Sequence, residues 1–96
     1  MCAIIGFTSL RLKKEQVQPY FEKTKSRGPD DTRMEPAGSG LLGFHRLAIM
    51  GLQPEGMQPF QLGHSYVVCN GEIYGFRPLK RQLTEKGYSF RSGSDC

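Results

Sequence analysis

The residue best suited to covalent chemistry is the cysteine at position 2. Removal of Met1 would leave a thiol and a free α-amine on this one residue, and initiator methionine is commonly removed before a small second residue. An α-amine ordinarily titrates at about pH 8 and a thiol at about pH 8.5. A neutral amine can therefore accept the thiol proton while the sulfur attacks a carbonyl carbon. Small second residues are also common in ordinary proteins, so Cys2 predicts a nucleophile only in combination with other residues.

The histidines and the second cysteine have structural interpretations. Because an α-amine could act as the base, neither histidine is needed for proton transfer. We interpret His45 as a packed or hydrogen-bonded strand residue and His64 as a loop residue. Cys69 lies in an apolar run, which predicts a buried small side chain. The 3 cysteines have neither metal-ligand spacing nor the pattern of a disulfide framework, so we expect reduced thiols and no metal site.

Length and composition exclude several classes of function. A chain of 96 residues fits at most one small domain. No run is apolar for long enough to span a bilayer, and the first residues lack the pattern of a signal peptide, so we expect a cytoplasmic protein with no membrane partner. The net charge is +4, but acids are interleaved with the bases and aromatic stacking platforms are lacking. We therefore expect solvated helix faces and no binding of nucleic acid.

Several short segments must position Cys2. The apolar run at 3–7 predicts a buried strand with Cys2 at its leading end. Apolar spacing between 13 and 25 predicts an amphipathic helix, which we place mainly after Pro19 because proline interrupts a regular helix. Residues 26–31 read as a turn or loop, and residues 41–50 and 66–69 as strands.

The clearest predicted element is a helix near the end of the chain. Pro78 suits its first turn, Leu79 and Leu83 share one face, and Gly87 suits the position after the C-cap. Residues 88–90 then read as extended. No repeat or linker divides the chain, which indicates one domain or part of one.

Six short motifs occur in an order that resembles a known family. They are MCAI at 1–4, RGPD at 27–30, GFHRL at 43–47, MQPF at 57–60, NGEIY at 70–74 and GSDC at 93–96. Each of them alone is an ordinary strand or turn sequence. In this order they resemble the N-terminal glutaminase domain of glutamine-hydrolysing asparagine synthetases, which is a class II glutamine amidotransferase with an N-terminal nucleophile. The resemblance covers essentially the whole chain.

The resemblance implies an α+β fold, namely a four-layer αββα sandwich of antiparallel sheets. Residues 1–96 would form about the first half of that domain, which would leave sheet edges and apolar faces uncovered. We therefore expect a partial glutaminase domain that is poorly stable alone or forms a homo-oligomer. The synthetase domain, with the ATP and Mg²⁺ that it implies, is expected outside this chain, and this segment itself is expected to need no cofactor.

The resemblance also implies an activity. The chain would hydrolyse L-glutamine to glutamate and ammonia through a thioester on Cys2, with the side-chain amide of Asn70 and the backbone N–H of Gly71 as the oxyanion hole. In the full enzyme the ammonia would amidate ATP-activated aspartate. An alternative is a truncated, non-catalytic remnant that binds glutamine or a partner. An unrelated basic domain that binds an acidic partner would require the six motifs to be coincidental.

Free glutamine carries one carboxylate and one ammonium group, and matching charges occur at positions that the resemblance assigns to substrate binding. Arg46 is the candidate for the carboxylate, because a guanidinium can donate two parallel hydrogen bonds. Glu72 and Asp95 are the candidates for the ammonium group. The resemblance places Arg27 and Asp30 on a loop over the site. It assigns the pocket wall to backbone groups of one segment, at Leu47, Ile49 and Met50.

Three residues depart from the usual pattern of this family. Ala3 replaces a common glycine, Ser26 a common histidine and Gly75 a common asparagine. The change at Gly75 would remove a polar side chain close to the expected oxyanion donors.

Overall fold

The described chain forms five strands, two α-helices and two 3-10 helices. The computed structural model describes residues 1–9, 11–49 and 53–95. In chain order these residues form β1 (Ala3–Thr8), α1 (Lys14–Glu22), the 3-10 helix η1 (Lys25–Arg27), β2 (Asp31–Ala37), β3 (Gly40–Arg46), the 3-10 helix η2 (Pro54–Gly56), β4 (Phe60–Leu62), β5 (Ser65–Val67) and α2 (Phe76–Glu85). Both sheets that they form are antiparallel, which confirms the predicted α+β class.

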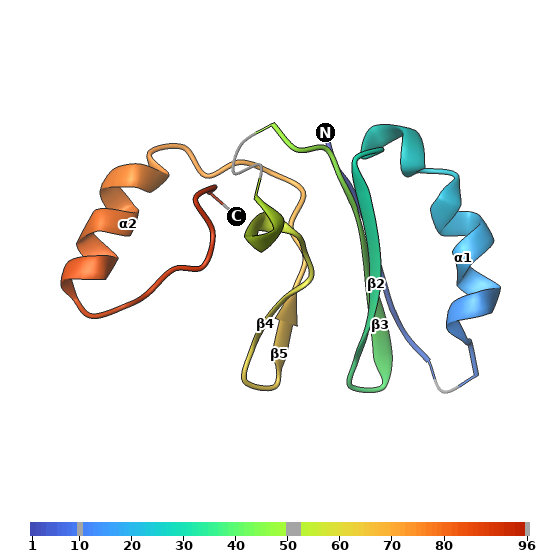
Figure 1. Cartoon of the computed structure of the whole chain (residues 1–96). Helices are drawn as coiled ribbons and strands as arrows, with labels where there is room; N and C mark the ends of the chain where they lie inside the picture. The colour runs from blue at the N-terminus through green and yellow to red at the C-terminus, as the bar shows by residue number, and fades with distance from the viewer. Residues whose placement is uncertain (10, 50–52, 96) are drawn as a thin grey trace.

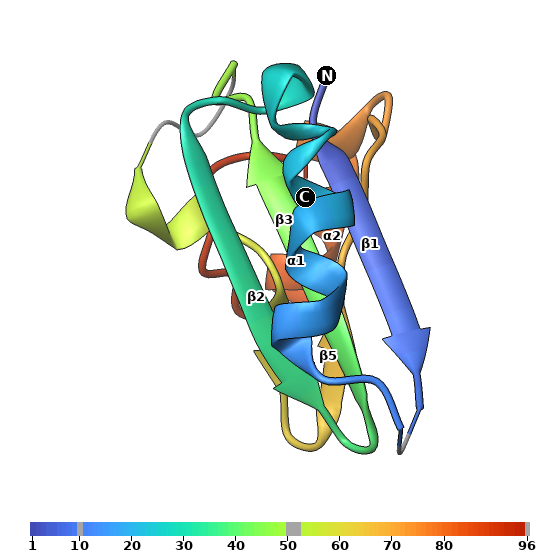
Figure 2. The ribbon, with the colours of Figure 1, turned by 90° about the vertical axis from the view of Figure 1, so that its right-hand side faces the viewer.

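Strand β3 is the centre of the larger sheet, whose order is β1-β3-β2. Both of its neighbours run antiparallel to it, and Ala3 of β1 pairs with His45 near the end of β3. Helix α1 lies across one face of this sheet (Figure 2), where Phe21 is buried. The predicted first strand is therefore present, and its pairing holds Cys2 beside the residues that end β3. Its predicted burial is wrong, because β1 is an edge strand in which only Ala3 is buried.

Successive residues of β3 face opposite sides of the sheet. His45 faces α1, and its ring stacks on Phe21 with 3.7 Å between the ring centres. Phe44 and Arg46 face the other side and line a cavity. The sheet therefore has one face covered by a helix and another face on which a site can form.

The side chain of His45 is completely buried, and both of its nitrogens have partners. Nε2 donates to the carbonyl oxygen of Phe21 at 3.0 Å, and Nδ1 lies 2.7 Å from the hydroxyl of Thr32. Gly28 packs against the backbone of the same residue, where an added Cβ would lie 2.2 Å from the carbonyl oxygen of His45. These contacts confirm the interpretation of His45 as a packed, hydrogen-bonded strand residue.

The β4–β5 hairpin and α2 lie on the side of the sheet away from α1. Figure 1 shows α1, the three-stranded sheet, the hairpin and α2 following one another across the molecule. Helix α2 has Pro78 in its first turn and is followed by Gly87 with a φ of 97°, as the sequence predicts. Leu79 and Leu83 line a second cavity of about 390 Å³ together with β4. The predicted shared face of these two leucines is therefore confirmed.

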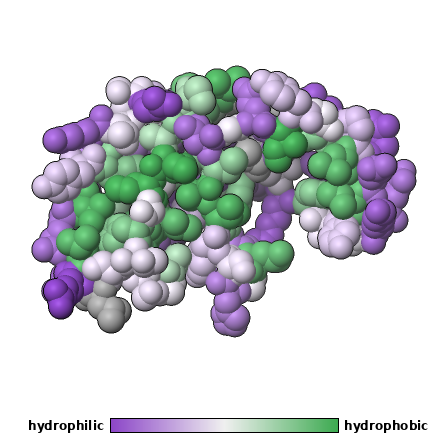
Figure 3. Space-filling model, turned by 180° about the vertical axis from the view of Figure 1, so that it is seen from behind, coloured by the Kyte–Doolittle hydropathy of each residue, from purple (hydrophilic) through white to green (hydrophobic). Residues whose placement is uncertain are grey.

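The chain exposes more surface than a compact monomer of its size. Its accessible surface is 7069 Å², whereas a 10.8 kDa monomer is expected to expose roughly 5,500 Å². Its radius of gyration is 14.6 Å, against roughly 12–13 Å for a compact chain of 96 residues. Figure 3 shows apolar side chains at the surface of both halves of the molecule. These values agree with uncovered apolar faces, while the four-layer sandwich stays a prediction.

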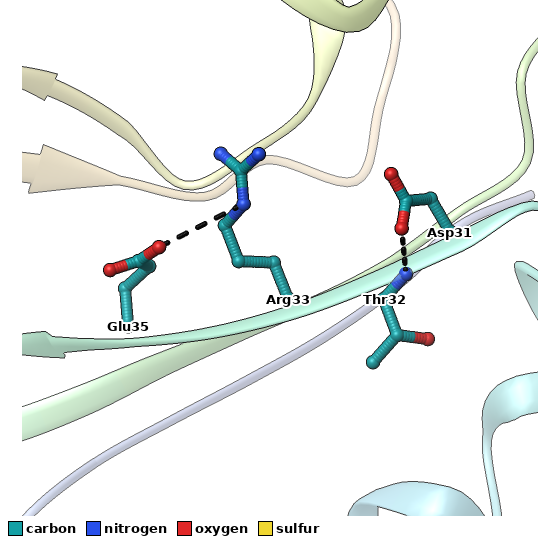
Figure 4. A network of polar contacts seen from close by, with 4 residues as sticks. All are labelled: Asp31, Thr32, Arg33 and Glu35. Carbon is teal, nitrogen blue, oxygen red and sulfur yellow. Dashed lines mark hydrogen bonds and ion pairs between the residues drawn. The ribbon is translucent and has the colours of Figure 1, made fainter.

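Strand β2 was not predicted, because its sequence is rich in charged residues. Arg33 and Glu35 lie on the same face of this outer strand, with 3.8 Å between Nε and Oε1 (Figure 4). The carboxylate of Asp31 accepts a hydrogen bond from the N–H of Thr32 at 2.8 Å. Exposed ion pairs of this kind add little stability, so pairing with β3 holds the strand. Charged side chains on an outer strand also discourage pairing with other chains.

The prediction that a helix lies mainly after Pro19 is wrong. Helix α1 begins at Lys14 and continues through the proline. The side chain of Gln16 accepts a hydrogen bond from the N–H of Lys13 at 2.8 Å, which supports the early start. Pro19 removes the helical hydrogen bond to the carbonyl of Glu15, but both residues are exposed, so water can bind that carbonyl.

Other boundaries also differ from the prediction. The strand predicted at 41–50 ends at Arg46, and Met50 lies outside the described residues. The strand predicted at 66–69 is β5, which ends at Val67. Part of the loop predicted at 26–31 is helical, because η1 ends at Arg27. Residues 88–90, predicted only to be extended, are described and belong to no strand. His64 lies in the β4–β5 turn as predicted. Neither α-helix of the described ranges is long and apolar enough to cross a membrane.

Candidate active site

A cavity of about 700 Å³ lies on the face of the sheet opposite α1. Its volume is in the range of about 300–1,000 Å³ that is typical of small-molecule sites. The walls come from the start of β1, the end of β3, the segment between β5 and α2, and the end of the described chain. Sequence-predicted residues in the lining are Cys2, Arg46, Leu47, Ile49, Asn70, Gly71, Glu72 and Asp95. Folding therefore brings these distant positions to one cavity, while Met50 lies outside the described residues.

The thiol of Cys2 lies against the backbone of Leu47. The N–H of Leu47 donates to Sγ at 3.3 Å, and Sγ lies 3.7 Å from the carbonyl oxygen of the same residue. The carbonyl oxygen of Cys2 accepts from Nε of Arg27 at 3.3 Å. Met1 is 67% exposed, whereas Cys2 is half-buried. Contacts of both its side chain and its backbone therefore hold Cys2 at the cavity wall, next to an accessible first residue.

Arg46 brings a positive charge into the same wall. The residue is only 8% exposed, and its Nη1 donates to the carbonyl oxygen of Gln53 at 3.0 Å. Its own carbonyl oxygen accepts from the N–H of Asp30 at 2.9 Å. The carboxylate of Asp30 in turn accepts from the N–H of Ala48 at 2.8 Å. Asp30 therefore fixes the backbone on either side of Leu47, the residue that contacts the thiol.

Arg27 and Asp30 bind the backbone of the cavity wall from outside the cavity. Neither is among the described residues that line it. Each contacts the backbone of a lining residue, Cys2 in one case and Arg46 in the other. Their expected position over the site stays a prediction.

Two carboxylates share the cavity with Arg46. Oδ2 of Asp95 accepts from the N–H of Ile73 at 2.6 Å, which fastens the end of the described chain to the segment before α2. Glu72 directly precedes Ile73 and lines the same cavity. A guanidinium and two carboxylates in one cavity are complementary to a ligand that carries both a carboxylate and an ammonium group.

The segment that follows β5 ends at Gly75, the N-cap of α2. Gly75 has a φ of 70°, in the left-handed region that glycine and asparagine tolerate best. The replacement of a common asparagine by Gly75 therefore suits this backbone conformation. At Gly71 an added Cβ would lie 3.8 Å from Sγ of Cys69, which is an ordinary contact. The protein alone does not require glycine at position 71.

Two residues of the cavity differ from their sequence interpretation. Cys69 was expected to be buried, but it is exposed and lines the cavity because β5 ends two residues earlier. Gln58 was not predicted to have a role in the site, although it lies in the MQPF motif. Gln58 is only 3% exposed, and both ends of its side-chain amide bind the backbone of Cys69. A polar residue between apolar neighbours was the available signal.

Comparison with known proteins identifies the family. The family described as "Glutamine amidotransferase domain" matches residues 1–96. A probable glutamine-hydrolyzing asparagine synthetase of Acanthamoeba polyphaga mimivirus is 35% identical and aligns with 100% of the chain. The root asparagine synthetase of Pisum sativum is 34% identical over 100% of the chain, and asparagine synthetase 1 of Lotus japonicus is 36% identical over 98%.

The chain spans only a small share of these relatives, namely 18%, 17% and 16% of their respective lengths. No solved structure matches the chain significantly.

Proposed function

Because the chain belongs to the glutamine amidotransferase domain family, we propose that it hydrolyses L-glutamine to glutamate and ammonia. The observation that carries this proposal is the cavity in which the thiol of Cys2 shares a wall with Arg46, Asn70 and two carboxylates. The names of the relatives, which are glutamine-hydrolyzing asparagine synthetases, support the same substrate.

The nucleophile of the proposed reaction is Sγ of Cys2, after removal of Met1. The free α-amine accepts the thiol proton while Sγ attacks the side-chain amide carbon of glutamine. The resulting ammonium then returns a proton to the departing nitrogen, which leaves as ammonia. The γ-glutamyl thioester that remains is hydrolysed by water, which releases glutamate and restores the thiol. Both the amine and the sulfur are thus regenerated in each cycle.

The negative oxygen of each tetrahedral intermediate needs hydrogen-bond donors. We assign this role to the side-chain amide of Asn70 and the backbone N–H of Gly71, which lie in the lining of the same cavity as Cys2. Donors fixed before the reaction stabilise the developing charge at no further cost of reorganisation.

Substrate recognition in this proposal depends on charge. Arg46 binds the α-carboxylate of glutamine, and Glu72 and Asp95 bind its α-ammonium group. The low exposure of Arg46 strengthens such a contact, because less water competes with it. Backbone groups of Leu47 and Ile49 complete the wall, and the same role is proposed for Met50.

The wider context is also part of the proposal. In an enzyme as long as these relatives, this segment would form part of a four-layer αββα glutaminase domain. A separate synthetase domain would use ATP and Mg²⁺ to activate aspartate. That part would lie outside the segment that matches this chain. Ammonia from Cys2 would amidate the activated aspartate there. The described residues of this chain are assigned no role with ATP or Mg²⁺.

A pair of cysteine variants tests the proposed reaction. Cys2→Ala should abolish ammonia release from glutamine. Cys69→Ala removes a second thiol from the described lining of the same cavity and should retain ammonia release. Ammonia release by Cys2→Ala would contradict the mechanism. Binding of glutamine without ammonia release by the unaltered chain would favour the alternative of a non-catalytic binding module.

A further inference from the structure

The buried amide of Gln58 forms a specific pair with one residue. Its Nε2 donates to the carbonyl oxygen of Cys69 at 3.2 Å, and its Oε1 accepts from the N–H of Cys69 at 2.6 Å. Gln58 is 3% exposed, and Met57 before it is 4% exposed. A buried amide without partners is strongly unfavourable, so the two hydrogen bonds are what make glutamine acceptable at this position.

The pair replaces backbone pairing at the end of the β4–β5 hairpin. The last ladder pair of this hairpin joins Phe60 to Val67, and the same register continued by two residues sets Gln58 opposite Cys69. β4 begins at Phe60, so the backbone ladder stops before the pair of Gln58 and Cys69. The side-chain amide of Gln58 has the donor and acceptor of a peptide group and binds Cys69 in place of the backbone.

Cys69 directly precedes the proposed oxyanion donors, Asn70 and Gly71. The segment that carries these donors is fixed again at Ile73, whose N–H is bound by Asp95. One restraint therefore lies on each side of the two donors, and the restraint on the β5 side is the amide of Gln58. Cys69 is itself an exposed residue beyond the end of β5, so the amide of Gln58 takes the place of a strand pairing there.

We propose that Gln58 is a positioning residue that sets the place of the oxyanion donors through its two hydrogen bonds to Cys69. This inference rests on the proposed glutaminase function. Gln58 acts through the backbone and not on glutamine itself, so its loss should affect the transition state more than substrate binding. Arg46, which is assigned to the α-carboxylate of glutamine, is fastened by a different contact, its hydrogen bond to Gln53.

Two substitutions separate the hydrogen bonds from packing. Gln58→Glu keeps the acceptor for the N–H of Cys69 but replaces the donor with a second oxygen that faces a carbonyl. Gln58→Met keeps the length of the side chain and removes both hydrogen bonds. The matched control is Gln61→Glu, which makes the same chemical change on an exposed residue of β4 whose Nε2 donates to the carbonyl oxygen of Gly63 at 3.1 Å.

The measurements are ammonia-release kinetics and amide hydrogen exchange of the full chain. In both Gln58 variants, kcat should fall on the order of 100-fold, since a small misplacement of a catalytic group costs about that much, while KM changes less than about threefold. Exchange at the amides of Cys69 and Gly71 should accelerate relative to β3. The control should match the unaltered chain in both measurements.

Unchanged exchange at Cys69 in both variants would overturn the proposal. So would a uniform rise of exchange over the whole chain, since that would mean only a loss of global stability. If the unaltered chain releases no ammonia, the glutaminase proposal fails, and local exchange at Cys69 and Gly71 still decides whether Gln58 sets the segment.

Discussion

Replacing His45 with phenylalanine tests whether the buried histidine has a structural or a catalytic role. The ring faces α1, on the opposite side of the sheet from the cavity that Phe44 and Arg46 line. The carbonyl oxygen of Phe21 can only accept, so Nε2 carries a proton, and in the neutral ring Nδ1 then accepts from the hydroxyl of Thr32. Both nitrogens are therefore occupied, and neither offers a lone pair to the proposed substrate.

The expected loss of stability follows from these contacts. Phenylalanine keeps an aromatic ring against Phe21 and removes two hydrogen bonds, each of which is worth about 1 kcal/mol. The carbonyl of Phe21 keeps two further donors from Thr24, its N–H at 3.0 Å and its hydroxyl at 2.8 Å. Thr32 is exposed, so water can bind its hydroxyl. We therefore expect a loss of about 2 kcal/mol, without a further penalty for unpaired groups.

The assay combines thermal unfolding with ammonia release. A loss of about 2 kcal/mol should lower Tm by about 8–16 °C in a chain of this size. Below that temperature, kcat should stay within about tenfold of the unaltered value, because a general base contributes about 10²–10⁴-fold. Thr32→Val leaves Nδ1 of the completely buried ring without this partner, so it should cost about 1–3 kcal/mol, comparable to the loss in His45→Phe. A 100-fold fall in kcat of folded His45→Phe would refute the reasoning and make His45 a candidate base.

Three further predictions concern a packed glycine, the oxyanion hole and self-association. Gly28→Ala should lower the free energy of unfolding by about 1–3 kcal/mol, because the new Cβ would lie 2.2 Å from the carbonyl oxygen of His45. The control Gly93→Ala, whose Cβ would have no atom within 4 Å, should leave stability unchanged. Equal denaturation midpoints of the two variants would show that the backbone at Gly28 shifts freely. Asn70→Ala should lower kcat by about 10²–10³-fold with little change in KM, and an unchanged kcat would remove Asn70 from the oxyanion hole. Leu62 is 79% exposed at the end of β4, so Leu62→Lys should reduce the self-association that sedimentation velocity measures. The same distribution of species in the variant and the unaltered chain would place the contact between copies elsewhere.

The elements that the sequence predicted well have strong local signals. The apolar run after Cys2 forms β1, and the proline and glycine that bound α2 occur at the expected ends. Local signals failed where tertiary contacts decide the structure. Strand β2 is polar and forms because it pairs with β3. Helix α1 continues through Pro19 because the carbonyl that loses its helical hydrogen bond is exposed to water.

The residues that line the cavity could also be predicted from the sequence, because most of them belong to the six motifs. What the sequence could not provide is how these residues are held. The contact of Sγ of Cys2 with Leu47 and the bond from Ile73 to Asp95 join segments far apart in the chain. The pairing of Gln58 with Cys69 depends on the register of a hairpin whose first strand was not predicted. The chemical roles of all these residues remain proposals.

The measurement that bears most directly on the glutaminase proposal is the intact mass of the full chain before and after treatment with a glutamine analogue that alkylates thiols. The proposal predicts a mass that lacks Met1, a single adduct that peptide mapping assigns to Cys2 and not to Cys69, and loss of ammonia release in proportion to labelling. Retention of Met1 in a chain that still releases ammonia, or full activity after Cys2 is labelled, would contradict an N-terminal nucleophile.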